Sequence, residues 1–296
     1  MVLALECGII SEVSWSINRL LRLSASDKFV LSMFPTLPSA LCRWPEWFLT
    51  HSEDEDDSLF SPSPSYNIYR RLALNSLLIL KNVAMGDEGV VVAKTERIRA
   101  LVIKIMQQFQ VPNDSTLEFL LSAMDIFRYT VHKWPAAPRV EEINTFVRIV
   151  GRSNDRAILV SGWYGLHHLL DTFTTTVLVT PTSEALNAAI RVLPIHIDQV
   201  LTAAALEYIL AHVSHPSLAK AFLHHPEMPQ VLRVLAHQLL HDQTKIIENV
   251  TQVLGTAPKT AIAQNNAIYM LELSREELDE LSNLTEPSRV TKWSVS

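Results

Sequence analysis

The stretch YRRLALNSLLILKNVAMGDEG, from Tyr69 to Gly89, is apolar on nearly every side yet carries Asn75 and Asn82. A helix on a protein surface needs only one apolar stripe, whereas a helix that is apolar all round is expected to be buried among neighbours. Such a helix needs packing partners on more than one side. The stretch therefore predicts the inner helix of a larger helical array.

The composition of the whole chain agrees with a helical protein. Its 296 residues are 48% apolar, which is enough to build a substantial core. Only 7 glycines are present, about a third of the usual frequency of roughly 7%, so few tight turns are expected. Short breaks with Pro, Ser, Asp or Asn separate the helical segments, and Asp114 or Ser115 is expected to cap the helix that follows them.

The pattern of the opening helix recurs along the chain. Ile17 to Leu23 matches Leu74 to Leu80 at every apolar position and at the asparagine, whereas Ala123 to Tyr129, Leu166 to Thr172 and Ala205 to Ala211 keep the early apolar positions but lose the asparagine. In chain order these five segments begin 57, 49, 43 and 39 residues apart. The later spacings resemble the ~40 to 47 residues of HEAT and armadillo repeats. The longest spacing contains an acidic insert.

These repeats predict an all-α fold, an armadillo/HEAT-like right-handed helical solenoid in which stacked repeats share one continuous core. We expect the array to cover residues 1–243, with a disordered acidic insert at 51–65. A polar linker at 244–267 and a short helical docking tail at 268–296 are expected to follow.

The asparagines of the inner helices have a structural interpretation. Asn18 occupies the same place in its segment as Asn75, and we predict that both are ladder groups that hydrogen-bond a neighbouring repeat's backbone. Leaving such a buried amide unpaired would cost about 1 to 3 kcal/mol. The alternative is that Asn18 and Asn75 grip a bound peptide. Asn82 has no counterpart, and we expect it to satisfy carbonyls at the helix end or to face a partner.

The charge distribution disfavours direct binding to nucleic acid. The formal net charge is −6, but residues 51–65 hold five acidic residues and no Lys or Arg. The remainder is therefore near neutral, without the clustered basic face that phosphate backbones require. No apolar run reaches the ~20 residues of a membrane span, so a soluble, intracellular protein is expected.

Catalytic and metal motifs are not found in the sequence. Neither GxSxG, GxGxxG nor GxxxxGK[ST] occurs, and SGWYG, Ser161 to Gly165, has a tryptophan where a nucleophile elbow has serine. Nine of the eleven histidines lie between His167 and His241, and we interpret them as solvated or helix-capping groups. Cys7 and Cys42 are expected to be buried free thiols. We therefore expect no enzyme activity, no cofactor and no metal.

Two clusters of large apolar side chains are candidates for a partner surface, because exposed aromatic anchors concentrate interface energy. One is CRWPEWFL and the other lies in the tail. The candidate residues are Trp44, Trp47, Phe48, Leu281, Leu284 and Trp293. Core packing is the alternative interpretation for each of them.

The sequence also resembles a known family. EVSWSINRLLRLS and LALNSLLILKNVAM, followed by the tail LSREELDELSNLTEPSRVTKW, are similar to the armadillo-type region of the fungal subunit-nine family of the RSC chromatin-remodelling complex, which is related to the ARID-containing subunit of PBAF. The tail matches the family's pattern at Glu276, Glu277, Leu278, Leu281, Leu284, Glu286, Pro287, Arg289 and Trp293. Unlike fuller members, this sequence has no ARID upstream and no RFX-like region after KWSVS.

The resemblance implies a non-catalytic scaffold subunit in the nucleus. Its expected partners are other subunits of an ATP-dependent remodelling complex of the RSC and SWI/SNF class, including an SNF-type ATPase, with only indirect contact to the nucleosome. Neither a membrane nor a small-molecule substrate is implied. From the residues alone, a cytosolic armadillo or HEAT adaptor that binds extended peptides remains the alternative, and an enzyme is the third class.

Overall fold

The structure is a computed structural model that describes residues 2–26, 29–51, 64–178, 182–193, 198–223 and 225–226. The predicted linker at 244–267 and docking tail at 268–296 lie outside these ranges, as does most of the predicted insert at 51–65. Within the described residues the chain is helical and contains no strand. This confirms the predicted all-α class.

The chain divides into two compact units, residues 1–149 and 150–296, and the boundary falls inside one helix, α9. The helices of the first unit are α1 (Val2–Glu6), α2 (Ile10–Ser24), η1 (Leu31–Met33), α3 (Leu37–Leu41), α4 (Arg43–His51), α5 (Pro64–Met85), α6 (Gly89–Lys94), α7 (Glu96–Gln108), α8 (Leu117–Thr130), η2 (Val131–Lys133) and α9 (Val140–Arg152).

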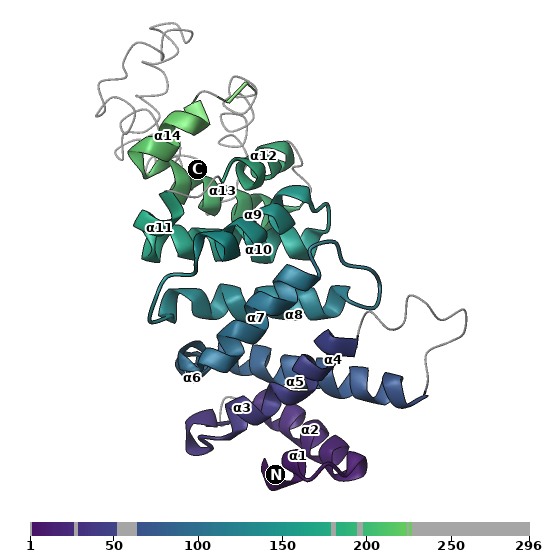
Figure 1. The fold of residues 1–296 in the computed structure, drawn as a ribbon. Helices are drawn as coiled ribbons and strands as arrows, with labels where there is room; N and C mark the ends of the chain where they lie inside the picture. The colour runs from purple at the N-terminus through teal and green to yellow at the C-terminus, as the bar shows by residue number, and fades with distance from the viewer. Residues whose placement is uncertain are drawn as a thin grey trace, which may run out of the picture. The chain divides into compact units, whose positions relative to one another are not determined.

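Helix α5 contains the stretch that predicted an inner helix, and it packs against α2 on one side and α8 on another (Figure 1). Helix α4 also packs against α5, and α7 packs against α8. Leu72, Leu77 and Leu80 of α5 are fully or almost fully buried. A single helix thus has apolar neighbours around much of its circumference, which explains its composition.

An aromatic cluster between α4 and its neighbours corrects part of the predicted partner surface. Phe48 is completely buried and stacks on Phe119 of α8 with ring centroids 4.0 Å apart. Trp44 is 7% exposed and stacks on Tyr69 of α5 at 5.6 Å. Full burial of a large apolar side chain contributes about 1.5 to 3 kcal/mol. The core-packing interpretation therefore applies to Trp44 and Phe48.

The remaining predicted contact residues have different outcomes. Trp47 is half-buried, with its ring 4.8 Å from that of Tyr69 in an edge-on arrangement. Only part of the Trp47 side chain is therefore exposed for contact with a partner. Leu281, Leu284 and Trp293 lie outside the described residues, so their assignment stays a prediction.

The second unit contains α10 (Arg156–Thr172), α11 (Thr174–Leu178), α12 (Ser183–Val192), α13 (Gln199–Val213) and α14 (Pro216–Leu223). Helix α13 packs against α10, α12 and α14. Trp163 of α10 is fully buried, and its indole N–H donates to the carbonyl of Ala185 in α12 at 3.3 Å. The SGWYG segment is therefore part of the core of this unit.

The two cysteines differ from each other. Cys42 is buried, as predicted, and burial raises the pKa of its thiol to about 12, so it stays protonated. Cys7 is exposed, which corrects the prediction. It lies just after the short helix α1, and its thiol donates to the carbonyl of Ala4 at 3.1 Å.

Across the described ranges, no helix combines the length and the apolar character that crossing a membrane would require.

Candidate functional site

The first polar link between inner helices joins α2 to α5. The Asn75 side-chain amide donates to the side-chain oxygen of Asn18 at 3.4 Å, and the Asn82 amide donates to the Ser24 hydroxyl at 3.1 Å. Asn18 and Asn75 thus connect neighbouring inner helices, as predicted. However, they bond each other and not a backbone, and Asn18 is exposed while Asn75 is half-buried. Asn82 takes a similar linking role, which its position in the sequence did not reveal.

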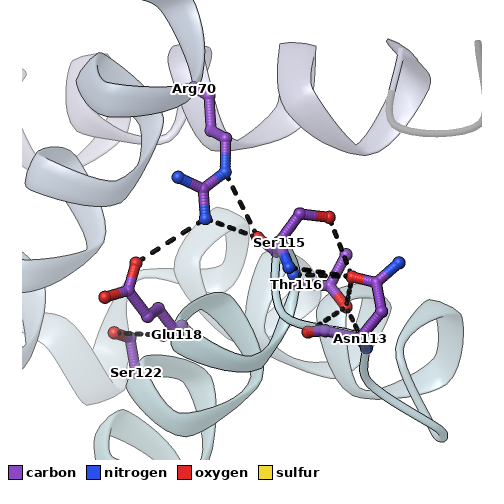
Figure 2. Close-up of polar contacts among 6 residues, drawn as sticks. All are labelled: Arg70, Asn113, Ser115, Thr116, Glu118 and Ser122. Carbon is purple, nitrogen blue, oxygen red and sulfur yellow. Dashed lines mark hydrogen bonds and ion pairs between the residues drawn. The ribbon is translucent and has the colours of Figure 1, made fainter. Parts of the chain in front are cut away.

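The second set of links joins α5 to α8. The Arg70 guanidinium donates to the carbonyl of Ser115 at 2.7 and 3.2 Å and lies 3.6 Å from the Glu118 carboxylate (Figure 2). Further along the same helices, Lys81 pairs with Asp125 at 2.8 Å. These contacts join the first turns of both helices and then their later turns, so α5 and α8 run parallel.

Asn113 shapes the turn that presents the Ser115 carbonyl to Arg70. Its side-chain oxygen accepts from the backbone N–H groups of Ser115 and Thr116 at 3.1 and 3.0 Å and from both hydroxyls (Figure 2). Such Asx turns satisfy backbone donors just before a helix. The predicted cap was Asp114 or Ser115, so the sequence placed the turn correctly, but the side chain that accepts from the backbone belongs to Asn113.

The two sets of links define an open strip on α5. Successive helical residues are 100° apart, which places Asn75 and Asn82 on the edge that faces α2, and Arg70 and Lys81 on the edge that faces α8. The positions between these edges are exposed or half-buried, whereas Leu72, Ala73, Ser76, Leu77, Ile79, Leu80, Val83 and Ala84 on the opposite side of the helix are buried. The exposed or half-buried positions are Asn67, Arg71, Leu74, Leu78 and Met85.

Helix α2 continues this strip on one side. Trp15, Asn18 and Arg22 recur at spacings of three and four residues and are all exposed, with Trp15 at 54%. The Arg19 guanidinium lies 5.6 Å from the centroid of the Trp15 ring, a favourable cation–π arrangement. A large aromatic side chain is therefore exposed at the surface beside the asparagine link.

Helix α8 continues the strip on the other side. Leu121 and Arg128 are seven residues apart and half-buried, next to the edge where Glu118 and Asp125 meet α5. We call the combined surface of the three parallel helices the ladder face. Its members are Trp15, Asn18, Arg22, Asn67, Arg71, Leu74, Leu78, Met85, Leu121 and Arg128.

The ten positions of the ladder face include three arginines and no carboxylate, and the exposed Glu12 lies one turn before Trp15 on α2. Arg22 and Arg71 are exposed and form no ion pair with any described residue. The carboxylates at its inner border, Glu118 and Asp125, are already paired with Arg70 and Lys81. Apolar Leu74, Leu78 and Met85 lie between the arginines. Sequence reasoning singled out neither Trp15 nor Arg71, although Arg71 is a charged residue within the largely apolar α5.

The second unit links its helices differently. Arg156 of α10 pairs with Asp198, whose carboxylate also accepts from the Leu201 backbone N–H at the start of α13. The Arg156 guanidinium lowers the pKa of the Asp198 carboxyl. The half-buried or exposed positions of α10 include Tyr164, His168 and Asp171. The arginine strip therefore has no counterpart on α10.

The described residues form neither a metal site nor a polar pocket suited to catalysis. No group of three or more His, Cys, Asp or Glu in the described part of the chain could hold a metal ion. A pocket of about 260 Å³ is lined by Val2, Leu3, Phe34 and Leu37, none of which is polar or titratable. Neither feature offers the nucleophile and base that covalent catalysis needs.

One histidine departs from the predicted solvated or capping role. His212 of α13 is 1% exposed, and neither of its ring nitrogens has a hydrogen-bond partner. Burial, with a smaller effect of His215, lowers the pKa of His212 to about 4. Its ring lies 5.7 Å from that of the buried Tyr208. His212 is therefore a neutral core residue in this unit.

Comparison with solved structures addresses the fold. A designed armadillo repeat protein in complex with the peptide (KR)4 superposes with a TM-score of 0.58 at 11% identity, over 87% of this chain and 98% of that chain. Computationally designed armadillo repeat proteins for modular peptide recognition give a TM-score of 0.59 at 11% identity, over 86% and 98% of the respective chains. The fold is an armadillo-type helical solenoid.

An engineered protein gives a TM-score of 0.56 at 14% identity, over 84% of this chain and 93% of its own. No protein-family model and no curated protein matches the sequence. The likeness to designed armadillo repeat proteins confirms the predicted solenoid fold. The resemblance to a remodelling-complex subunit stays a prediction.

Proposed function

We propose that this chain is a non-catalytic interaction scaffold that binds an extended segment of a partner protein across the ladder face. The observation that carries the proposal is the open strip of α5, where exposed or half-buried side chains lie between two rows of inter-helix links. The links hold three parallel helices in register, so the surface is rigid before a partner arrives. Binding to a rigid surface avoids part of the entropic cost of association.

Trp15 is the expected anchor of this surface. It is a large aromatic side chain with 54% of its surface exposed, and the Arg19 guanidinium lies 5.6 Å from its ring centroid. Exposed aromatic side chains of this kind carry much of the binding energy of protein interfaces. The exposure of Asn18 and the partial exposure of Asn75 also favour peptide binding over a purely internal role, as an adaptor would require.

We further propose that the partners are subunits of a nuclear, ATP-dependent chromatin-remodelling complex, among them an SNF-type ATPase. This rests on the similarity of the segments around Asn18 and Asn75 and of the tail that ends in KWSVS to the RSC subunit-nine family. In this role the chain would meet the nucleosome only indirectly. The alternative is a cytosolic adaptor that uses the same ladder face for extended peptides.

Affinity purification of the full chain from nuclear extract, followed by mass spectrometry, tests both parts of the proposal. We expect an SNF-type ATPase and other remodelling subunits to co-purify at mild salt. Trp15→Ala is expected to reduce their recovery about tenfold, because an aromatic anchor is removed. Val111→Ala is the matched control, since Val111 is 87% exposed and lies outside the ladder face.

The possible failures are distinct. Recovery of other partners without remodelling subunits would contradict membership of such a complex but leave the scaffold role intact. Equal recovery by the wild type and Trp15→Ala would contradict the ladder face as the binding surface. A cytosolic location together with Trp15-dependent partners would favour the adaptor.

A further inference from the structure

We infer that the ladder face selects acidic segments, in which carboxylates alternate with apolar side chains. This inference rests on the proposed binding function and adds the chemical class of the ligand. The relevant groups are Arg22 and Arg71, which are exposed and unpaired among the described residues, beside half-buried Leu74 and Leu78. Carboxylates are the natural partners of guanidinium groups, which they accept in bidentate geometry.

The positive charge is not cancelled by the acidic residues at the border of the face. Glu118 lies 3.6 Å from Arg70, and Asp125 lies 2.8 Å from Lys81. These carboxylates are occupied within the links between α5 and α8. The exposed arginines of the ladder face are thus left to attract negative charge from outside the unit.

The placement of the two exposed arginines on adjacent helices sets the length of segment that the face can bind. Arg22 lies on α2 and Arg71 lies on α5, so the two exposed guanidinium groups come from adjacent parallel helices. Packed helices are about 8 to 10 Å apart, and an extended chain advances about 3.3 to 3.6 Å per residue. A segment that crosses the face therefore advances about two to three residues per helix. Roughly eight residues are enough to cross α2, α5 and α8.

The apolar side chains of the ladder face add a second requirement, because a bound segment needs apolar residues as well as carboxylates. Leu74 and Leu78 lie one turn apart between the two edges of α5, and Met85 continues their line with 55% exposure. Side chains of an extended segment alternate between two sides. Alternate residues can therefore pack on the leucines while the intervening carboxylates meet arginine at the sides.

Neither α10 nor α13 of the second unit carries an exposed arginine without an ion pair. In α10 of the second unit, Arg156 is paired with Asp198, and the open positions of that helix hold Tyr164, His168 and Asp171. Helix α13 contributes the acidic Glu207 at a half-buried position. An acidic segment is therefore expected to bind the first unit in preference to the second.

The test uses the full chain and two labelled octapeptides of matched apolar content, (Asp-Leu)4 and (Lys-Leu)4, with binding measured by fluorescence anisotropy. The acidic peptide is expected to bind at least tenfold more tightly at low salt. This preference should shrink as salt is raised to about 0.5 M, because exposed charges are then strongly screened. Trp15→Ala should weaken the binding of the acidic peptide in every salt condition.

Charge reversal then locates the effect. Arg71→Glu should weaken the acidic peptide about tenfold and improve the basic one, because attraction becomes repulsion. Arg148→Glu is the matched control, since Arg148 is an exposed arginine of α9 outside the ladder face. It is expected to leave the difference between the peptides unchanged apart from a small effect of net charge. Circular dichroism melting curves confirm that the exposed substitutions leave the fold intact.

Three results overturn the inference. If both peptides bind equally and only Trp15→Ala weakens them, charge selection is wrong but the proposed binding face stands. If Arg148→Glu acts as strongly as Arg71→Glu, the preference comes from net charge and not from the ladder face. If neither peptide binds and Trp15→Ala also leaves partner recovery unchanged, the inference and the proposed binding face both fail.

Discussion

At the scale of single residues, the environment of each polar or aromatic side chain decides its role. Trp15 and Trp44 both lie in helices next to arginine, yet Trp15 is 54% exposed and Trp44 only 7%. His212 is likewise buried while other histidines of the same unit, such as His167 and His215, keep partial exposure. Residue type and helical spacing alone do not separate these cases, because exposure depends on which neighbouring helix covers the position.

His212 should make the stability of the second unit depend on pH. Its pKa is lowered to about 4 in the folded state, whereas an unfolded histidine has a pKa of about 6.5. Between these values the unfolded chain binds more protons, so the free energy of unfolding falls as pH decreases. The slope is at most about 1.4 kcal/mol per pH unit. Stability is therefore fully present above about pH 6.5 and is lost as pH falls towards 4.

Urea unfolding at pH 7 and pH 5 checks this expectation. His212→Phe should remove most of the pH-dependent loss, and at pH 7 it should be close to neutral because two unpaired ring nitrogens leave the core. Leu206→Ala is the control, since it also weakens the core of α13 but retains the histidine. An unchanged pH slope in His212→Phe would show that another group is responsible.

At the scale of elements, close contact between helices explains why glycine occurs inside one of them. Gly162 lies in the middle of α10, where glycine is normally unfavourable by up to about 1 kcal/mol relative to alanine. A Cβ atom on Gly162 would lie 2.3 Å from a methyl carbon of Val150, in the last turn of α9. The glycine therefore permits a close approach of two helices.

Gly162→Ala tests this packing, because two effects of opposite sign compete. In an isolated helix the alanine would be stabilising, but here the overlap with Val150 is expected to destabilise the protein by about 1 to 3 kcal/mol. The double variant Gly162→Ala, Val150→Ala should recover much of the loss. Thermal unfolding followed by circular dichroism measures both. A more stable Gly162→Ala single variant would disprove the close approach.

At the scale of the whole molecule, a solenoid is stabilised by contacts between neighbouring units of structure. Phe127 of α8 is 1% exposed because Trp134 and Phe146 cover it, with ring centroids 5.3 and 4.5 Å away. Phe146 belongs to α9, which contains the boundary between the compact units. The start of α9 is therefore needed to complete the core of the first unit.

Truncation tests this dependence on the neighbouring helix. A fragment of residues 1–149 retains Phe146 and should show strong hydrogen-exchange protection in α8. A fragment of residues 1–138 lacks it and should lose much of that protection. Phe146→Ala in the full chain should act in the same direction, with a cost of about 3 to 5 kcal/mol. Equal protection of α8 in both fragments would contradict the nearest-neighbour account.

The sequence by itself determined the class of fold. Scarce glycine, all-round apolar helices and a recurring spacing are sufficient for a helical array, because each reflects local conformation and the total amount of apolar surface. The same patterns placed Asn18 and Asn75 at links between repeats. The helical array and the positions of Asn18 and Asn75 follow from helical periodicity, which a single sequence shows directly.

Only the tertiary structure decided which side chains the ladder face presents. It buried Trp44 and Phe48, exposed Trp15, and left Arg71 exposed while Arg70, the residue before it, joined α5 to α8. The physical reason is that a turn of 100° between adjacent residues moves a side chain from a packed edge to an open one. Which edge is packed depends on helices far away in the sequence, and no local pattern records that.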